Sequence, residues 1–224
     1  MERMERITVK DVMKNEYVEQ LIARGNEMLG VLGYTEHSKI HAGRVSARAG
    51  MILKQLGCPK RQIELARIAG YMHDIGNAVN RHDHAHSGAI LVFQILRDMG
   101  MGPAETAAVM SAVGNHDENT GTAFDPISAA LILADKTDVR RDRVRNKDMS
   151  TFDIHDRVNY AAKSAELTVN VEKKVIHLDI NLDDEICSML DYFEIFLERM
   201  LMCRRAAEML GTRFKLTANG SKVL

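Results

Sequence analysis

Residues 65–76 read LARIAGYMHDIG, and this stretch decides the fold that we expect. Its apolar residues recur at intervals of three and four, as on one face of a helix: Leu65, Ile68, Ala69 and Met72. The stretch then places His73 and Asp74 at the end of that face. Ionisable groups on a face that packs into a core are costly to bury unless they are paired or bind a metal. The stretch therefore predicts a helix that carries two candidate metal ligands, His73 and Asp74, in its C-terminal part.

Helical patterns surround this stretch. We expect helices over residues 11–32, 39–56, 60–79, 87–100 and 103–115, and a sixth that begins at Asp125–Pro126. Gly33 suits a left-handed helix end, Ser87 suits an N-cap, and Pro103 suits a first helical turn. The predicted fold class is therefore all-α, a helical bundle.

The pattern changes after residue 138. Apolar residues alternate over 167–171 and again over 176–180, which predicts a β-hairpin, and a long last helix is predicted over 183–210. We expect residues 1–138 to form the main domain, with its core at 39–138, and residues 139–224 to form an appendage that packs on it. The tail 212–224 is expected to be loose. The last helix carries a wide apolar stripe, which indicates either core packing or a homodimer contact.

Composition narrows the class of protein. The 224 residues carry a net charge of −1, no tryptophan and 5% aromatic residues, so nucleic acid is an unlikely partner. Cys58, Cys187 and Cys203 are too far apart for a thiolate metal site and indicate a reducing compartment. The N-terminus is charged, and no apolar run is long enough to cross a membrane. We therefore expect a cytoplasmic protein with no membrane partner.

Further candidate ligands stand on apolar helices. His116 follows Val109, Ala112 and Val113, and Asp135 follows Leu131 and Ile132. A single histidine on a helix is more often a hydrogen-bonded core or surface residue than a ligand. Several ionisable residues of ligand type on core-facing stripes make a divalent metal the economical explanation.

The order of these residues resembles the HD-domain superfamily of metal-dependent phosphohydrolases. The matching segments are HAGRV from His41, HDIG from His73, HSGAIL from His86, NHDE from Asn115 and LADKTD from Leu133. They span residues 39–138, nearly half of the chain. Two positions depart from patterns common in the family: Asn77 replaces the lysine of HDIGK, and Asn115 replaces the first histidine of HHE.

The resemblance implies a set of metal ligands. The first ion would be held by His41, His73, Asp74 and Asp135, and Asp74 would bridge to a second ion. His86 and His116 would complete the second position. His86 is preferred over His84 because HSGAIL matches the start of a family helix, and His84 is the alternative. His82 and His84 otherwise read as loop residues in solvent, and His37 either faces the site or is exposed.

The resemblance also implies roles beyond metal binding. Arg44 lies three residues after His41 on a similar helix face, and Lys136 and Arg140 follow Asp135. These three are candidate contacts for the substrate phosphate, although each charge is as easily solvated. Asp117 is a candidate for orienting a water molecule or the ring of His116. The charged stretch 140–147 reads as a solvated helix with internal ion pairs, and the second His-Asp pair at 155–156 reads as chance.

The function that the resemblance implies is hydrolysis of a phosphate ester by metal-activated hydroxide. The substrate would be a small nucleotide or related metabolite, and the enzyme a phosphomonoesterase or phosphodiesterase. The cofactor would be one or two divalent ions, with iron, manganese, zinc, nickel and cobalt all open. Two alternatives remain: a diiron oxygenase of the mixed-valent HD type, and a non-catalytic nucleotide-binding regulator.

Overall fold

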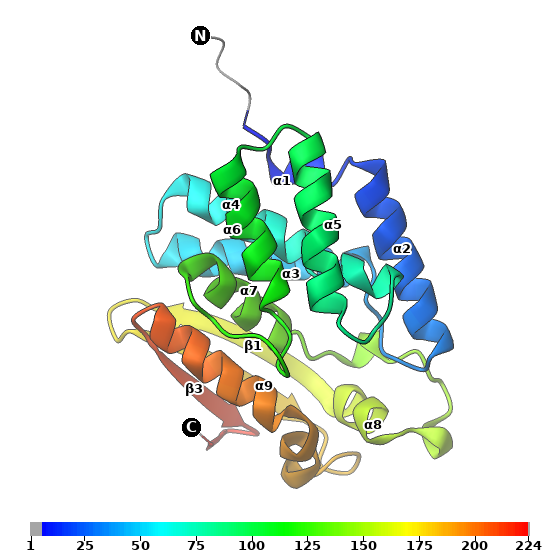
Figure 1. The fold of residues 1–224 in the computed structure, drawn as a ribbon. Coiled ribbons are helices and arrows are strands. Elements are labelled where there is room, and N and C mark those ends of the chain that lie inside the picture. The colour runs from blue at the N-terminus through cyan, green and yellow to red at the C-terminus, as the bar shows by residue number, and fades with distance from the viewer. Residues whose placement is uncertain (1–5, 224) are drawn as a thin grey trace.

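The computed structural model describes residues 6–223, and its helices gather on one side of a small sheet (Figure 1). The helices before residue 138 are α1 Val9–Val12, α2 Glu16–Val31, α3 Lys39–Gln55, α4 Lys60–Met72, α5 His84–Asp98, α6 Pro103–Gly114 and α7 Pro126–Lys136. Their existence and order follow the apolar pattern of the sequence. Pro103 opens α6, and Asp125 caps α7 with a carboxylate that accepts from the Ser128 amide.

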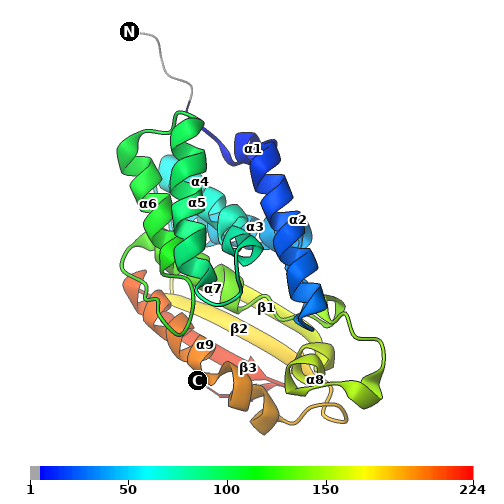
Figure 2. The same ribbon diagram turned by 45° about the vertical axis from the view of Figure 1, so that its right-hand side comes forward.

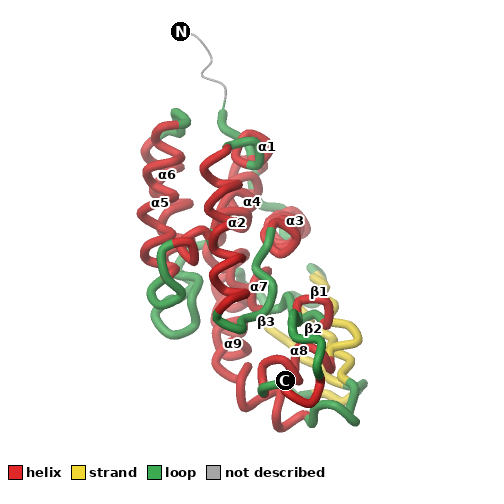
Figure 3. The backbone as a smooth tube through the Cα atoms, turned by 90° about the vertical axis from the view of Figure 1, so that its right-hand side faces the viewer, coloured by secondary structure: helices red, strands yellow, loops and turns green. Residues whose placement is uncertain are grey.

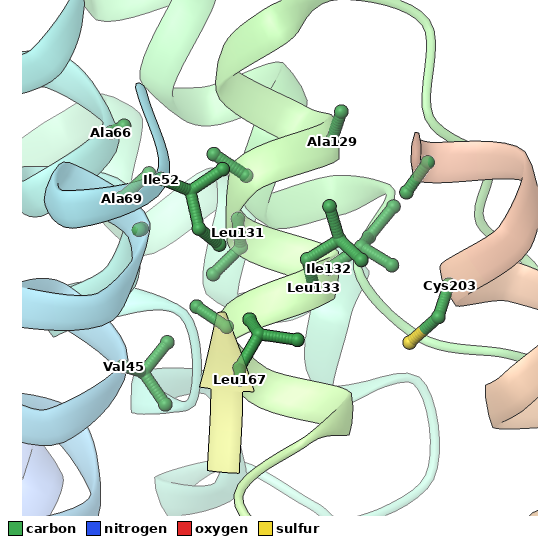
Figure 4. Close-up of a cluster of buried hydrophobic side chains, with 14 of the residues drawn as sticks. Val45, Ile52, Ala66, Ala69, Ala129, Leu131, Ile132, Leu133, Leu167 and Cys203 are labelled. Carbon is green, nitrogen blue, oxygen red and sulfur yellow. The ribbon is translucent and has the colours of Figure 1, made fainter. Parts of the chain in front are cut away.

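Helix α7 lies at the centre of the molecule. Its residues from Ile127 to Ala134 are all buried, as expected for a helix that is apolar on every side. Figure 4 shows Leu131 facing Ile52 of α3 and Ile132 lying on the side of Cys203, which belongs to α9 Met189–Met209. Polar residues at the end of α7 are consequently held in the interior by packing.

The C-terminal part contains a four-stranded sheet, so the fold is helical but not all-α. The strands are β1 Ala162–Asn170, β2 Val175–Leu182, β3 Arg213–Ala218 and β4 Ser221–Lys222, in that spatial order. The predicted hairpin is confirmed as the antiparallel pair β1–β2. Helix α9 then returns the chain so that β3 lies parallel to β2 (Figure 2).

The prediction of a loose tail is wrong. Phe214, Leu216 and Ala218 of β3 are buried and alternate with outward-facing residues. Leu178 of β2 lies between Leu167 of β1 and Leu216 in the register of the sheet. The sheet therefore buries one face, and strand β3 belongs to the core, whereas Ser221–Lys222 are exposed and Leu224 lies outside the described residues.

Four predicted boundaries also move. The helix predicted over 11–32 is divided into α1 and α2, with a break at residues 13–15. Helix α4 ends at Met72, and a 3-10 turn, Ile75–Ala78, follows the His-Asp pair. Helix α5 begins at His84, three residues before the predicted cap, and α9 begins after Ser188 because that residue makes a capping box with Asp191.

The stretch after α7 is not a solvated helix. It holds a 3-10 turn, Arg141–Arg143, then a second, Met149–Thr151, and the short helix α8 Ile154–Ala161. Arg143 is buried and donates to the main-chain carbonyls of Glu36 and Asp138 at 2.9 Å. Figure 3 shows α8 beside the sheet, at the end opposite to α1.

One hydrophobic core joins the helices to the sheet, because α7 packs against α9 on one side and against α3 and α4 on the other. Phe196 and Met200 of α9 are buried in that core, whereas Leu190 and Leu197 stay exposed. The homodimer contact through α9 therefore stays a prediction. Within residues 6–223, no helix is long and apolar enough to span a bilayer.

Replacing Leu216 with alanine tests whether β3 belongs to the cooperative fold. The side chain is fully buried, so Leu216→Ala should lower the free energy of unfolding by about 2–5 kcal/mol. The neighbouring Lys215→Ala faces outward and should change it by less than about 0.5 kcal/mol. Urea unfolding followed by circular dichroism measures both. Equal stability of the two variants would mean that β3 is not part of the core.

Candidate metal centre

Four histidines and two aspartates converge where the ends of several helices meet. His41 comes from α3, the pair His73–Asp74 follows α4, His84 opens α5, His116 follows α6, and Asp135 lies near the end of α7. All four histidines are buried, and the aspartate side chains are only 11% and 13% exposed. The packing of these helices brings the six groups into one cluster.

Three of the rings are fixed in the same way. In each, Nδ1 lies within hydrogen-bond distance of the main-chain carbonyl three residues earlier. The pairs are His73 with Gly70 at 2.9 Å, His84 with Arg81 at 3.1 Å, and His116 with Val113 at 2.6 Å. A carbonyl oxygen only accepts, so Nδ1 carries the hydrogen and Nε2 of each neutral ring keeps a free lone pair.

The fourth ring is fixed by a carboxylate. Nδ1 of His41 donates to Oδ2 of Asp138 at 2.8 Å. Burial acts to raise the pKa of Asp138, but the hydrogen bond from His41 and the charge of Arg143 outweigh burial and lower it. Asp138 is thus an ionised acceptor that turns Nε2 of His41 toward the cluster. Such partners fix the orientation of histidine ligands in metal sites.

Asp74 divides the cluster into two halves. Its Oδ2 lies 3.2 Å from Nε2 of His73 and 3.7 Å from Nε2 of His41. Its Oδ1 lies 3.6 Å from Nε2 of His84 and 3.9 Å from Nε2 of His116. One carboxylate therefore presents a separate oxygen to each pair of rings, which is the arrangement of a bridging ligand.

Asp135 completes the first half. Its Oδ1 lies 3.3 Å from Nε2 of His41 and 3.6 Å from Nε2 of His73. Three groups of ligand atoms lie within 4.8 Å of one another: His41, His73 and Asp74; His73, His116 and Asp135; and Asp74, His84 and His116. The groups overlap, so the cluster has room for one or two ions.

The unpaired nitrogens test whether a metal fits. Nε2 of His41 and Nε2 of His73 are buried and have no hydrogen-bond partner among residues 6–223. Nε2 of His84 lies only 3.2 Å from Nε2 of His116, so two lone pairs face each other. A cation between these atoms removes both penalties. The residues therefore fit divalent ions that accept imidazole and carboxylate ligands.

The pKa values of two histidines in the cluster are shifted in opposite directions. Burial acts to lower the pKa of His73, but Asp74 and Asp135 outweigh it and raise that pKa to about 10. Burial, with His73 and His84 nearby, lowers the pKa of His116 to about 3. The carboxylate charge is concentrated around His73, where a positive charge is most strongly stabilised. His116 is neutral and offers the lone pair of its Nε2.

The structure brings His84, and not His86, to the cluster. Asp83 adopts a left-handed conformation, with φ of 56°, and α5 begins directly after it. His84 therefore points inward from the first helical position, and His86, about 200° further round the helix, is 57% exposed. The preference for His86 was wrong because the helix starts earlier than the motif suggested.

Of the predicted phosphate contacts, Lys136 lies at the cluster and Arg44 does not. Arg44 is exposed and lines a different groove, near Arg48 and Lys163, so its prediction is wrong. A residue seven positions after His41 matches its helix face better than one three positions after it. Arg48 is accordingly less exposed and donates to Oγ1 of Thr137 at 3.1 Å, but it lines the same groove as Arg44 and not the cavity at the cluster.

Lys136 and Asp117 both lie near the cluster. Lys136 is buried, with Nζ 2.9 Å from Oδ2 of Asp135 and 2.6 Å from Oε2 of Glu118. Asp117 lies 3.9 Å from Nδ1 of His84. The ring of His116 is held by a main-chain carbonyl instead, so the structure does not give Asp117 the role of orienting it.

Residues that the sequence reading missed surround the cluster. Glu118 accepts from Nε of Arg199 at 2.8 Å and lies against Lys136, which links α9 to Asp135. Burial acts to raise the pKa of Glu118, but the charges of Lys136 and Arg199 outweigh the effect of burial and lower this pKa. Asp138, in the LADKTD segment, was visible in the sequence, whereas no local pattern pointed to Arg199.

A cavity of about 490 Å³ opens onto the cluster. His37 lines it, and its Nδ1 donates to the carbonyl of Thr35 at 2.7 Å, so His37 faces the site. The second His-Asp pair, His155 and Asp156, lines the same cavity from α8. That pair is consequently part of the surroundings of the site.

The exchange of His86 for His84 can be tested directly. His84→Ala should lower the metal content of reconstituted protein by up to one ion per chain, because it removes a ring from the half that contains His116. His86→Ala should leave the content unchanged, because that ring lies in solvent. Elemental analysis of both variants measures the effect, and metal loss in His86→Ala alone would restore the original assignment.

The role of Asp138 gives a second test. Asp138→Asn keeps the shape but removes the charge that orients His41, so metal affinity should fall about 10-fold or more. Asp142→Asn is the matched control, because Asp142 also pairs with Arg140 but is exposed. Competition with a chelating dye measures both affinities. Equal affinities would exclude an orienting role for Asp138.

Several known proteins are similar to this chain. An uncharacterised protein of Methanocaldococcus jannaschii, MJ1020, is 28% identical over 199 residues, which cover 78% of this chain and 76% of that protein. Ribonuclease Y of Aquifex aeolicus is 28% identical, and Ribonuclease Y of Lawsonia intracellularis 30% identical, each over 119 residues. These matches cover 53% and 50% of this chain but only 20% and 21% of the two ribonucleases.

A solved structure is also similar in part. A predicted HD superfamily hydrolase from an uncultured Thermotogales bacterium is 25% identical, with a TM-score of 0.43, over 60% of this chain and 75% of that chain. The model of the HD domain matches residues 39–157, which hold all six converging side chains. That match covers just over half of the sequence, and the chain therefore belongs to the HD domain family.

Proposed function

We propose that this chain hydrolyses phosphate esters at a centre of two divalent ions. The ligands would be His41, His73, Asp74, His84, His116 and Asp135, with Asp74 between the two ions. One observation carries the proposal: the two carboxylate oxygens of Asp74 face two different pairs of imidazole nitrogens. Membership of the HD domain family supports a hydrolase.

The residues of the chain have separable tasks in such a reaction. Divalent ions, when bound, supply a water of lowered pKa and a Lewis acid for a phosphoryl oxygen. Asp74 and the four rings would hold that charge in a buried place. Lys136 keeps Asp135 ionised, since its charge helps to lower the pKa of that carboxyl against the effect of burial. Asp117, close to His84, is placed to accept a proton at the rim.

The cavity indicates a small substrate. About 490 Å³ is the size of pocket that holds metabolites and mononucleotides. Tyr34 and Phe196 line it and offer aromatic surface, while Arg81, Arg143 and Arg199 add positive charge. These features support a phosphorylated metabolite, in particular a nucleotide. The similarity to the two ribonucleases favours RNA phosphodiesters as a second candidate.

A substrate panel on metal-reconstituted protein tests the proposal. The panel contains nucleoside monophosphates, cyclic nucleotides, generic monoesters and short RNA, with metal content measured on the same sample. Asp74→Ala should abolish bound metal and turnover together, because it removes the shared ligand, whereas His86→Ala should retain both. Turnover by metal-free Asp74→Ala protein would contradict the proposal.

An anaerobic arm separates hydrolysis from oxygenase chemistry. Hydrolysis should proceed with manganese and without oxygen, because it needs no change of oxidation state. Turnover that requires both iron and oxygen would instead support a diiron oxygenase. Binding of nucleotides with no turnover on any ester would support a regulator.

A further inference from the structure

We infer that Arg81 is a substrate-binding residue that contacts an anionic phosphate group in the cavity, and that Asn77 and Tyr34 position it. The inference rests on the proposed function, since it names a residue that would select the substrate of that site. Arg81 lies in the loop before α5 and lines the cavity together with Asp74 and His84.

The guanidinium of Arg81 is held from two sides. Its Nη1 donates to Oδ1 of Asn77 at 3.3 Å, and its Cζ lies 5.5 Å from the centre of the Tyr34 ring. Asn77 is buried, and its Nδ2 donates to Oδ1 of Asp74 at 2.9 Å. A continuous chain of contacts thus connects Arg81 to the carboxylate between the two halves of the cluster.

The other cations of the cavity have carboxylate partners. Lys136 lies against Asp135 and Glu118, and Arg199 donates to Glu118. Arg143 lies 3.9 Å from Oδ2 of Asp138. Across residues 6–223, no carboxylate oxygen lies within the 4.0 Å ion-pair distance of Arg81. Arg81 is therefore the lining arginine whose charge is left for a ligand.

This arrangement suits phosphate. A guanidinium presents several N–H groups in a fixed plane that matches the oxygens of a phosphate, and stacking on an aromatic ring keeps that plane in place. The main-chain carbonyl of Arg81 also accepts from Nδ1 of His84. A phosphate at the metal ligands would consequently lie beside a residue whose backbone fixes one of those ligands.

The test compares wild type, Arg81→Ala and Arg81→Lys, each loaded with metal. Arg81→Ala should raise KM about 10- to 100-fold and leave kcat within about threefold, because it removes a charge-assisted contact to bound substrate. Calorimetry with inorganic phosphate should show a similar loss of affinity. Arg81→Lys should recover part of both, because it restores the charge without the planar fork.

Arg97→Ala is the matched control. Arg97 also stands over an aromatic ring, with Cζ 5.8 Å from the centre of Phe93, but it lies on the exposed side of α5 next to Asp98. Its replacement should leave KM, phosphate affinity and metal content unchanged. A change equal to that of Arg81→Ala would show a general effect of surface charge and overturn the inference.

The remaining outcomes also decide the question. Unchanged phosphate affinity and KM in Arg81→Ala would overturn the inference and leave the proposed function intact. Loss of metal in that variant would overturn it too, by assigning Arg81 to the structure of the centre. A wild type that hydrolyses no ester would contradict the proposed function, while the phosphate calorimetry would still decide whether Arg81 binds anions.

Discussion

Four imidazole Nε2 atoms face one another in the interior, and a cation among them lowers the cost of burying them. The rings cannot turn away, because each Nδ1 is committed to a carbonyl or to Asp138 and would lose a buried hydrogen bond. The helices α4, α5 and α6 each start or end at a ligand, so their lengths set the geometry of the centre. The hydrogen bonds that fix the tautomer of each buried ring thus also direct its Nε2 toward the place where a metal would bind.

The backbone after the His73–Asp74 pair packs closely against the start of α5, and this contact brings ligands from the two segments together. A Cβ on Gly76 would lie 1.9 Å from the carbonyl oxygen of His84 and 2.5 Å from the amide of Gly88. The turn after Asp74 therefore presses directly on the first turn of α5, where His84 stands. The glycine of HDIG lets the halves of the cluster meet, and α7, buried on every side, supports Asp135 from behind.

Much of this could be predicted from the sequence, for physical reasons. His73, Asp74, His116 and Asp135 stood out because ionisable groups on apolar helices are rare without a purpose, whereas His41 came from the resemblance to the HD-domain superfamily. His84 was ranked below His86 because the start of α5 depends on the left-handed Asp83, which apolar spacing does not encode. Strand β3 was missed although Phe214, Leu216 and Ala218 alternate, because its pairing with β2 depends on a distant segment.

Helix α9 connects the parallel strands β2 and β3, so this part of the fold can form only late during synthesis on the ribosome. All six converging side chains have been synthesised by residue 135, yet α9, which packs against α7 and brings Arg199 to Glu118, is synthesised later. Strand β2 waits still longer for β3. The emerging chain thus displays its ligands before their final surroundings exist, and the centre matures last.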